Sequence, residues 1–273
     1  MLNSIFKNSL EIPVIKLSGV IGQTGMFKSG INLFSLNKLI EKAFSGKKTK
    51  AVSLLINSPG GSPSQSSLIA AKIKSLAVKK KIKVYAFVVD VAASGGYWLA
   101  CAADEIYINE NSIVGSIGVI SPGFGFVQML KKLGIERRVY TSGKSKSFLD
   151  PFQNTKQDDL KRLKSIQEQI HNNFINHVKK SRGKKIKVKD SEVFNGLFWV
   201  GSKAVDLGLV DGIGNIEEIL RSKFGEKTKI KIIEQKKSFI QKKLSSSIDK
   251  KLIDSTDIIN AFEERAYWSR FGL

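Results

Sequence analysis

Residues 82–96, IKVYAFVVDVAASGG, join a β-branched apolar run to a cluster of small residues around Ser94. A continuous apolar run with a helix start directly behind it is typical of a strand covered on both faces of a parallel sheet. The run at 51–57, AVSLLIN, has the same character and leads into Pro59-Gly60-Gly61. Both strands therefore end in turns of small residues, where the backbone can close on a bound group.

Strands and helices alternate outward from this pair. Further strands are predicted at 12–22, 104–108, 113–120 and 135–141, helices at 31–45, 63–80, 93–103 and 155–182, and a short helix with a final core strand within 199–214. This order predicts an α/β protein in which helical crossovers join mainly parallel strands.

A change of composition after residue 225 predicts a main domain over 1–225 and a basic C-terminal extension over 226–273. The extension ends in an apolar set that includes Phe262, Trp268 and Phe271. Such a set suits docking on its own domain, on a neighbouring subunit or at a membrane interface.

The charge balance is strongly basic, with 45 Lys and Arg against 24 Asp and Glu and a net charge of +21. This charge favours anionic partners, and a solvated Lys-rich surface is the alternative. The basic clusters lack interleaved aromatic residues, so we do not expect nucleic acid as a partner. The single cysteine, Cys101, allows no internal disulfide, and no run reaches the ~18 apolar residues of a membrane span. We expect no signal peptide, a cytoplasmic location and, through the basic surface and apolar end, peripheral contact with anionic membrane.

Catalysis by histidine or metal is not indicated. The two histidines, His171 and His177, lie six residues apart on a polar helix, which is not the spacing of a helical zinc pair. Ser94 has small neighbours that would leave its hydroxyl accessible to a substrate, and the N–H of Gly95 would favour a developing oxyanion there. Its alternative role is that of a helix N-cap. The Gly60-Gly61 turn has two interpretations of its own: a tight turn, or a loop whose uncovered N–H groups close on a carbonyl oxygen or a phosphate.

A serine nucleophile still needs a base. With histidine disfavoured, the remaining type is a lysine whose pKa burial lowers. Thr141-Ser142-Gly143-Lys144-Ser145-Lys146 follows a predicted strand, and from the residues alone Lys144 and Lys146 are equal candidates, with a solvated loop as the alternative.

Five motifs follow one another along the chain: NSPGG at 57–61, AASGGYW at 92–98, GSIGVI at 115–120, SGKSK at 142–146 and LGLVDGIG at 207–214. Together they resemble the signal peptide peptidase A family of serine peptidases, which is related in fold to the Clp protease subunit and to crotonases. The resemblance covers about residues 12–220 and implies a crotonase-like or Clp-like fold of repeated β-β-α units with mainly parallel strands.

The resemblance also implies roles for individual residues. Ser94 matches the nucleophile, Lys146 the general base, and Gly61 and Gly95 the backbone donors of the oxyanion hole, while Ser116 matches a hydroxyl that orients the lysine. It further implies a homo-oligomer whose active site is completed between neighbouring copies. The expected substrates are extended apolar peptides such as remnants of signal peptides, and neither metal nor organic cofactor is needed.

Two other functions are compatible with parts of the sequence. A crotonase-type acyl-CoA enzyme would use the same loops on a thioester enolate, although Ser94 followed by two glycines argues against it. A basic, non-catalytic binding protein would bind through its +21 charge and would not react with a serine-directed fluorophosphonate.

Overall fold

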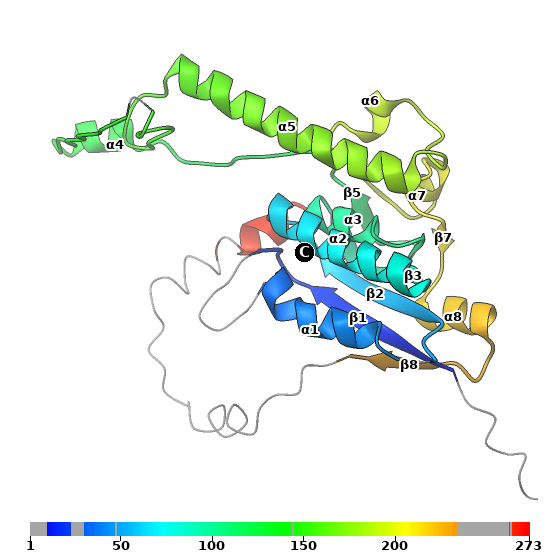
Figure 1. Cartoon of the computed structure of the whole chain (residues 1–273). Helices are drawn as coiled ribbons and strands as arrows, with labels where there is room; N and C mark the ends of the chain where they lie inside the picture. The colour runs from blue at the N-terminus through cyan, green and yellow to red at the C-terminus, as the bar shows by residue number, and fades with distance from the viewer. Residues whose placement is uncertain (1–9, 23–29, 47, 144, 234–261, 263) are drawn as a thin grey trace, which may run out of the picture. The chain divides into compact units, whose positions relative to one another are not determined.

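A mainly parallel sheet organises the larger part of the chain (Figure 1). The computed structural model describes residues 10–22, 30–46, 48–143, 145–233, 262 and 264–273. Within them the strands are β1 (Glu11–Ser18), β2 (Ala51–Ser58), β3 (Lys83–Ala93), β4 (Glu105–Ile108), β5 (Ile113–Gly115), β6 (Phe198–Val200), β7 (Gly212–Ile213) and β8 (Lys229–Ile232). The helices are α1 (Leu33–Ala43), α2 (Pro63–Lys80), α3 (Gly95–Ala100), α4 (Val127–Lys132), α5 (Gln157–Arg182), α6 (Asp190–Val193), α7 (Gly201–Asp206) and α8 (Ile216–Phe224).

The chain divides into two units. One holds Met1–Ile117 with Ile175–Leu273, and the other holds Gly118–Phe174. The sheet belongs to the first unit, where the strands run in the order β6-β5-β3-β2-β1-β8, with β4 paired to both β3 and β7. All pairs are parallel except β5 with β6. The predicted α/β class with mainly parallel strands is therefore confirmed.

Apolar periodicity explains how helices cover this sheet. In α1 the buried residues Leu36, Ile40 and Ala43 recur at the spacing of one helical face, and in α2 the buried pair Ile69 and Ile73 does the same. Figure 1 shows α1, α2 and α3 along the strands β1 to β3. Burying each such Leu or Ile stabilises the fold by about 1.5–3 kcal/mol.

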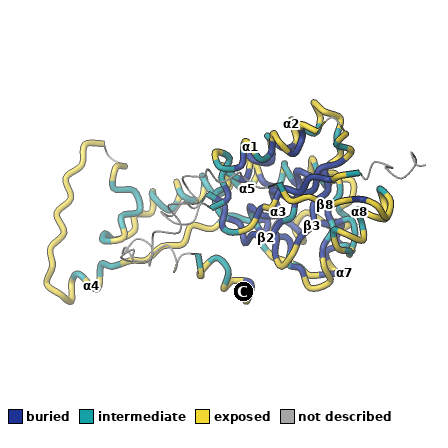
Figure 2. Tube along the Cα trace, turned by 90° about the horizontal axis from the view of Figure 1, so that it is seen from below, coloured by how far each residue is buried: buried dark blue, intermediate teal, exposed yellow. Residues whose placement is uncertain are grey.

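A cluster of buried hydrophobic residues packs around α8. It contains Ile12, Ala51, Tyr85, Phe87 and Leu220 as fully or almost fully buried residues. Figure 2 shows the strands β2 and β3 buried, as expected for central strands of a parallel sheet.

The second unit is far less buried, and Figure 2 shows exposed chain around α4. Its own contacts include the Phe126 and Phe152 rings, whose centroids lie 5.2 Å apart, and an ion pair of 2.9 Å between Arg137 and Asp150. The predicted strand at 135–141 was wrong, because these residues have no regular secondary structure and are exposed. A strand needs a neighbour to pair with, and Glu136, Arg137 and Arg138 interrupt the apolar alternation of this segment.

Several other predictions were inaccurate in extent. The strand predicted over 12–22 ends at Ser18, and the helix predicted over 93–103 spans only Gly95–Ala100. The strand predicted over 113–120 ends at Gly115, because Gly115 and Ser116 have φ of 108° and 51° and turn the chain out of the extended conformation. The long helix predicted over 155–182 is α5, whereas α4, α6, α8 and β8 were not predicted.

The domain boundary near residue 225 stays a prediction. Within the residues after it, β8 pairs in parallel with β1, and Phe271 packs against Val91 and Ala93. The C-terminal aromatic end therefore contacts its own unit. No helix in the described ranges has the length and apolar character required to cross a bilayer.

Candidate active site

Ser94 lies at the junction of β3 and α3 in an uncommon backbone conformation. Its φ is 51° and its ψ is −120°, although a residue with a Cβ disfavours positive φ. Its N–H donates to the carbonyl of Gly115 at 2.8 Å, and its own carbonyl accepts from the N–H of Trp98 at 3.0 Å. The side chain makes no capping hydrogen bond and is half-buried. The Ser94 backbone is thus fixed by hydrogen bonds on both sides, and its hydroxyl is not used to cap the helix.

The two glycine turns meet at this serine. A methyl group added at Gly60 would lie 2.9 Å from the Cβ of Ser94, and one added at Gly95 would lie 3.4 Å from the amide nitrogen of Gly61. Positions 60 and 95 therefore lack side chains because the turns are in van der Waals contact. These distances show that both glycine turns lie at the same edge of the sheet.

Gly61 and Gly95 carry the amides predicted to bind an oxyanion. Gly95 is the first residue of α3, where an N–H has no acceptor within the helix. Among the described residues, neither the Gly61 N–H nor the Gly95 N–H donates a hydrogen bond to the protein. Gly61 is clamped between two bonds, from the Ile21 N–H to Gly60 and from the Ser62 N–H to Ile21, both 2.8 Å long. Two unpaired donors on fixed backbone are the elements that an oxyanion hole requires.

Ser116 is connected to Ser94 through the backbone of the residue before it. It follows Gly115, whose carbonyl accepts from Ser94, and its own N–H donates to Leu197 at 2.7 Å. The side chain is buried and the φ of 51° equals that of Ser94.

Lys146, the predicted base, lies in the second unit. It is exposed and sits in a turn where its N–H donates to Gly143 at 3.1 Å. Lys144, the other candidate, lies outside the described residues. The structure thus brings together Ser94, Gly61, Gly95 and Ser116, whereas the pairing of Ser94 with a lysine stays a prediction.

His177 and Trp98 form a contact that the sequence analysis missed. The His177 ring stacks on Trp98 with centroids 5.0 Å apart, and its Nε2 lies 2.9 Å from the Trp98 carbonyl, an acceptor, so Nε2 carries a proton. Burial, with a further contribution from Lys74 and Lys180, lowers the pKa of His177 to about 4 against the raising effect of the Trp98 carbonyl. The histidine therefore packs neutral on the helix that follows Ser94. The sequence signal for this packing was the apolar pair Phe174 and Val178, which lie close to His177 on α5 and are buried in the structure.

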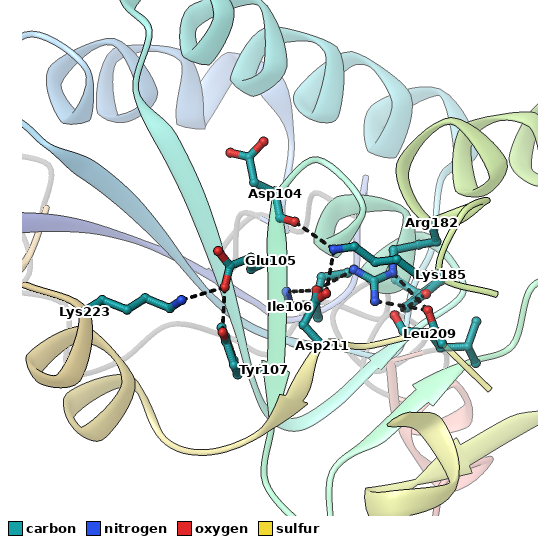
Figure 3. A network of polar contacts seen from close by, with 11 residues as sticks. Asp104, Glu105, Ile106, Tyr107, Arg182, Lys185, Leu209, Asp211 and Lys223 are labelled. Atoms are coloured by element: carbon teal, nitrogen blue, oxygen red, sulfur yellow. Dashed lines mark hydrogen bonds and ion pairs between the residues drawn. The ribbon is translucent and has the colours of Figure 1, made fainter. Parts of the chain in front are cut away.

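A dense ionic network was also missed (Figure 3). Arg182, with a side chain 1% exposed, donates to the Gly208 carbonyl and pairs with Asp211, to which Lys185 also donates. Burial acts to raise the pKa of Asp211, but bonds from Arg182, Lys185 and the Ile106 N–H outweigh it and lower the pKa below its usual value. Because every acceptor here is occupied, this network holds α5 to the LGLVDGIG segment and is not a reaction centre.

Beside that network, Glu105 accepts from Lys223 and from the Tyr107 hydroxyl (Figure 3). The thiol of Cys101 is fully buried, and burial raises its pKa to about 12, so it is an inert core group. In the part of the chain described, no three His, Cys, Asp or Glu side chains are grouped to hold a metal ion.

Comparison with known proteins links the chain to peptidases. A sequence profile described as Peptidase family S49 matches residues 76–230. A relative from Enterococcus faecium, named putative signal peptide peptidase SppA, is 32% identical over 300 residues, which cover 97% of this chain and 85% of the relative.

A Brucella abortus relative named Na(+)/H(+) antiporter NhaA is 45% identical over 273 residues. The match takes in 96% of this chain but only 37% of that much longer protein. This chain therefore resembles only a minor part of the protein that carries the antiporter name.

A solved structure of a mutant of the 1510-N membrane-bound stomatin-specific protease superposes with a TM-score of 0.51. It is 14% identical, and the match covers 84% of this chain and 99% of that one. A likeness at this identity concerns the fold, and it agrees with the predicted crotonase-like or Clp-like arrangement.

Proposed function

The chain belongs to peptidase family S49, and from this premise we propose that it is a serine peptidase in which Ser94 is the nucleophile and Lys146 the general base. The membership confirms the resemblance seen in the sequence. The observation that carries the proposal is the meeting of an uncapped Ser94 hydroxyl with the unpaired amides of Gly61 and Gly95.

The reaction follows from these groups. Neutral Lys146 takes the proton of the Ser94 hydroxyl as its oxygen attacks the peptide carbonyl. The N–H groups of Gly61 and Gly95 donate to the oxyanion, and such donors are worth about 10²–10³-fold in rate each. The lysine then gives its proton to the leaving amine, and water hydrolyses the acyl-enzyme by the reverse proton path. The buried Ser116 is suited to hydrogen-bond the lysine and orient it.

The base is expected to come from a neighbouring copy. A lysine is a base only when neutral, which requires burial or nearby positive charge. Lys146 is exposed in the single chain, so a second surface has to cover it. We therefore place Lys146 of one copy beside Ser94 of the next in a closed homo-oligomer.

The proposed substrates are extended, apolar peptides such as signal-peptide remnants. An extended peptide binds varied sequences through backbone pairing at a sheet edge, while apolar pockets select side chains. The basic charge supports peripheral contact with anionic membrane, and sedimentation with anionic vesicles at low salt tests that contact.

The direct test is labelling with a fluorophosphonate. We expect one adduct by intact mass, located on Ser94 by peptide mapping and absent in Ser94→Ala. Lys146→Ala should lose both labelling and peptide cleavage, with Lys144→Ala as the matched control that keeps them. A protein that binds anions but is never labelled would instead be the non-catalytic binding protein.

Mixing inactive subunits tests the shared site. If serine and lysine come from different copies, Ser94→Ala and Lys146→Ala refolded together at equal amounts recover activity at about a quarter of their sites, by random assembly of a ring. No recovery in a mixed oligomer would assign both residues to one copy.

A further inference from the structure

One side chain, that of Asn57, ties together the two strand ends that lead into the amide-bearing turns. Its Nδ2 donates to Asp90 Oδ2 at 2.6 Å, and its Oδ1 accepts from the Val91 N–H at 3.3 Å. Asn57 lies near the end of β2, three residues before Gly60, and Val91 lies on β3, three residues before Ser94.

An irregularity in the sheet explains the need for this side chain. Ile56 pairs with Val88, but Ser58 pairs with Ala92, so four residues of β3 advance against two of β2. Such a bulge takes backbone groups out of the ladder. The Asn57 amide replaces a strand neighbour for the Val91 N–H, and a carboxamide is suited to this because it presents an acceptor and a donor together.

The bulge is held from the other side as well. The Ser112 hydroxyl donates to the carbonyl of Val89 at 2.5 Å, and the Asn57 carbonyl accepts from the Gly19 N–H at 2.9 Å. Asn57 is thus fixed to β1 by its backbone and to β3 by its side chain. Its amide orientation follows from its partners, because an N–H faces the oxygen and a carboxylate faces the nitrogen.

We propose that Asn57 is a positioning residue, with Asp90 as its partner, that fixes the spacing between the Gly61 amide on one turn and Ser94 with the Gly95 amide on the other. This inference rests on the proposed function. The argument is geometric: the donors sit on turns that leave different strands, and the Asn57 side chain crosses between those strands immediately before the turns. An oxyanion requires its donors within about 2.7–3.1 Å, and a displacement of about 1 Å costs about 100-fold in rate.

A purely structural role predicts a different result. Asn57 is half-buried and Asp90 is exposed, so losing their bond should lower the melting temperature by no more than about 2–4 °C, the effect of a single ordinary hydrogen bond in a unit of this size. A positioning role adds a loss of rate in a protein that is still folded at the assay temperature.

The test is Asn57→Asp, which keeps the size but replaces the donor by a carboxylate facing Asp90. We expect kcat to fall about 10- to 100-fold with KM within about threefold, because bound substrate is held but its oxyanion is not. Labelling of Ser94 by the fluorophosphonate should slow by the same factor. Asn176→Asp, an exposed position on α5, adds the same charge and should leave both rates unchanged.

A swap restores the complementarity. In Asn57→Asp with Asp90→Asn, the new carboxylate at 57 accepts both from Val91 and from the new amide at 90, so kcat should return to within about threefold of the original. Should Asn57→Asp not fold, Asp90→Ala removes the acceptor of the Asn57 amide and is expected to show the same loss of kcat.

The outcomes separate the two proposals. Wild-type protein that neither cleaves peptides nor is labelled at Ser94 overturns the proposed function. Active wild-type protein together with a folded Asn57→Asp variant of unchanged kcat overturns the positioning role alone. A swap variant that folds but stays as slow as Asn57→Asp also overturns it.

Discussion

Replacing Arg182 by alanine should be among the most destabilising single changes in the larger unit. The Arg182 side chain is 1% exposed, and its Nε and Nη2 lie 3.2 and 3.1 Å from the Gly208 carbonyl. Its Nη1 lies 2.5 Å from Asp211, whose side chain is 16% exposed. Arg182→Ala therefore removes both of these donors from a buried carbonyl, and it removes one of the two cations that lie 2.5 Å from the mostly buried Asp211 carboxylate.

The magnitude follows from what is left behind. A buried acceptor without a partner costs about 1–3 kcal/mol. Asp211 keeps Lys185 and the Ile106 N–H, which limits the penalty on its charge. Breaking a buried pair from one side typically costs about 3–5 kcal/mol, and we expect Arg182→Ala to lower the free energy of unfolding by that amount.

The assay is urea unfolding followed by tryptophan fluorescence, since Trp98 and Trp199 both lie in the larger unit. The control is Arg221→Ala, which removes an exposed i,i+4 pair with Glu217 at 3.2 Å and should cost less than about 0.5 kcal/mol. If Arg182→Ala loses under about 1 kcal/mol, or no more than the control, the reasoning about the buried network is refuted.

The same network has a pH signature. The pKa of Asp211 is lower in the folded protein than in the unfolded chain, where it is about 3.9. Its stabilising contribution is therefore complete above about pH 5 and is lost as pH falls through the lower folded value. In Arg182→Ala the folded pKa should rise toward about 3.9 or above, so this part of the acid dependence should shrink.

Three further changes test the site and its surroundings. Gly61→Ala places a Cβ 2.2 Å from the Ile21 carbonyl at a φ of 135°, so the turn has to move and kcat/KM should fall about 10²–10³-fold in a peptide assay. His177 has a pKa of about 4 in the folded protein against about 6.5 unfolded, so acidification from pH 7 to 4 should cost about 3 kcal/mol of unfolding free energy, and His177→Gln should remove that pH dependence in urea titrations. Phe271→Ala removes the buried contact with Val91 and Ala93 and should speed tryptic release of the C-terminal residues about tenfold, measured by mass spectrometry.

Each of these three has a control. Gly123→Ala adds a methyl group with no heavy atom within 4 Å and should keep full activity, so equal losses at both glycines would contradict the role of the Gly61 turn. A His177→Gln variant with the wild-type pH dependence would contradict its low pKa. Phe262 is 73% exposed, and Phe262→Ala should leave the tryptic rate unchanged, whereas equal acceleration by both Phe variants would contradict the docking of Phe271.

Local patterns were sufficient for the elements around the candidate site. The apolar runs before NSPGG and AASGG predicted β2 and β3, and the helix predicted over 63–80 is α2, Pro63–Lys80. These signals are short-range, because hydrophobic periodicity and turn residues act within a few positions. For the same reason the serine could be placed at the end of a strand, at the start of a helix.

The weaker predictions concern residues that depend on distant neighbours. The segment at 135–141 was predicted as a strand, yet it has no strand beside it in the described chain. In the sequence Arg182 is one basic residue among 45 Lys and Arg, and no pattern in its own helix indicates that it contacts Asp211 and Gly208. Lys146 stays a prediction because its role depends on what covers it.

Composition, periodicity and motif order thus established an α/β chain of mainly parallel strands with a serine and two glycine turns at the strand ends, because those properties reside in neighbouring residues. Tertiary structure decided the rest: that the Gly61 amide meets Gly95, that Asn57 bridges a bulge to Asp90, and that β8 closes beside β1. Each of these joins residues separated by more than thirty positions, and such contacts arise only when the whole sheet has assembled.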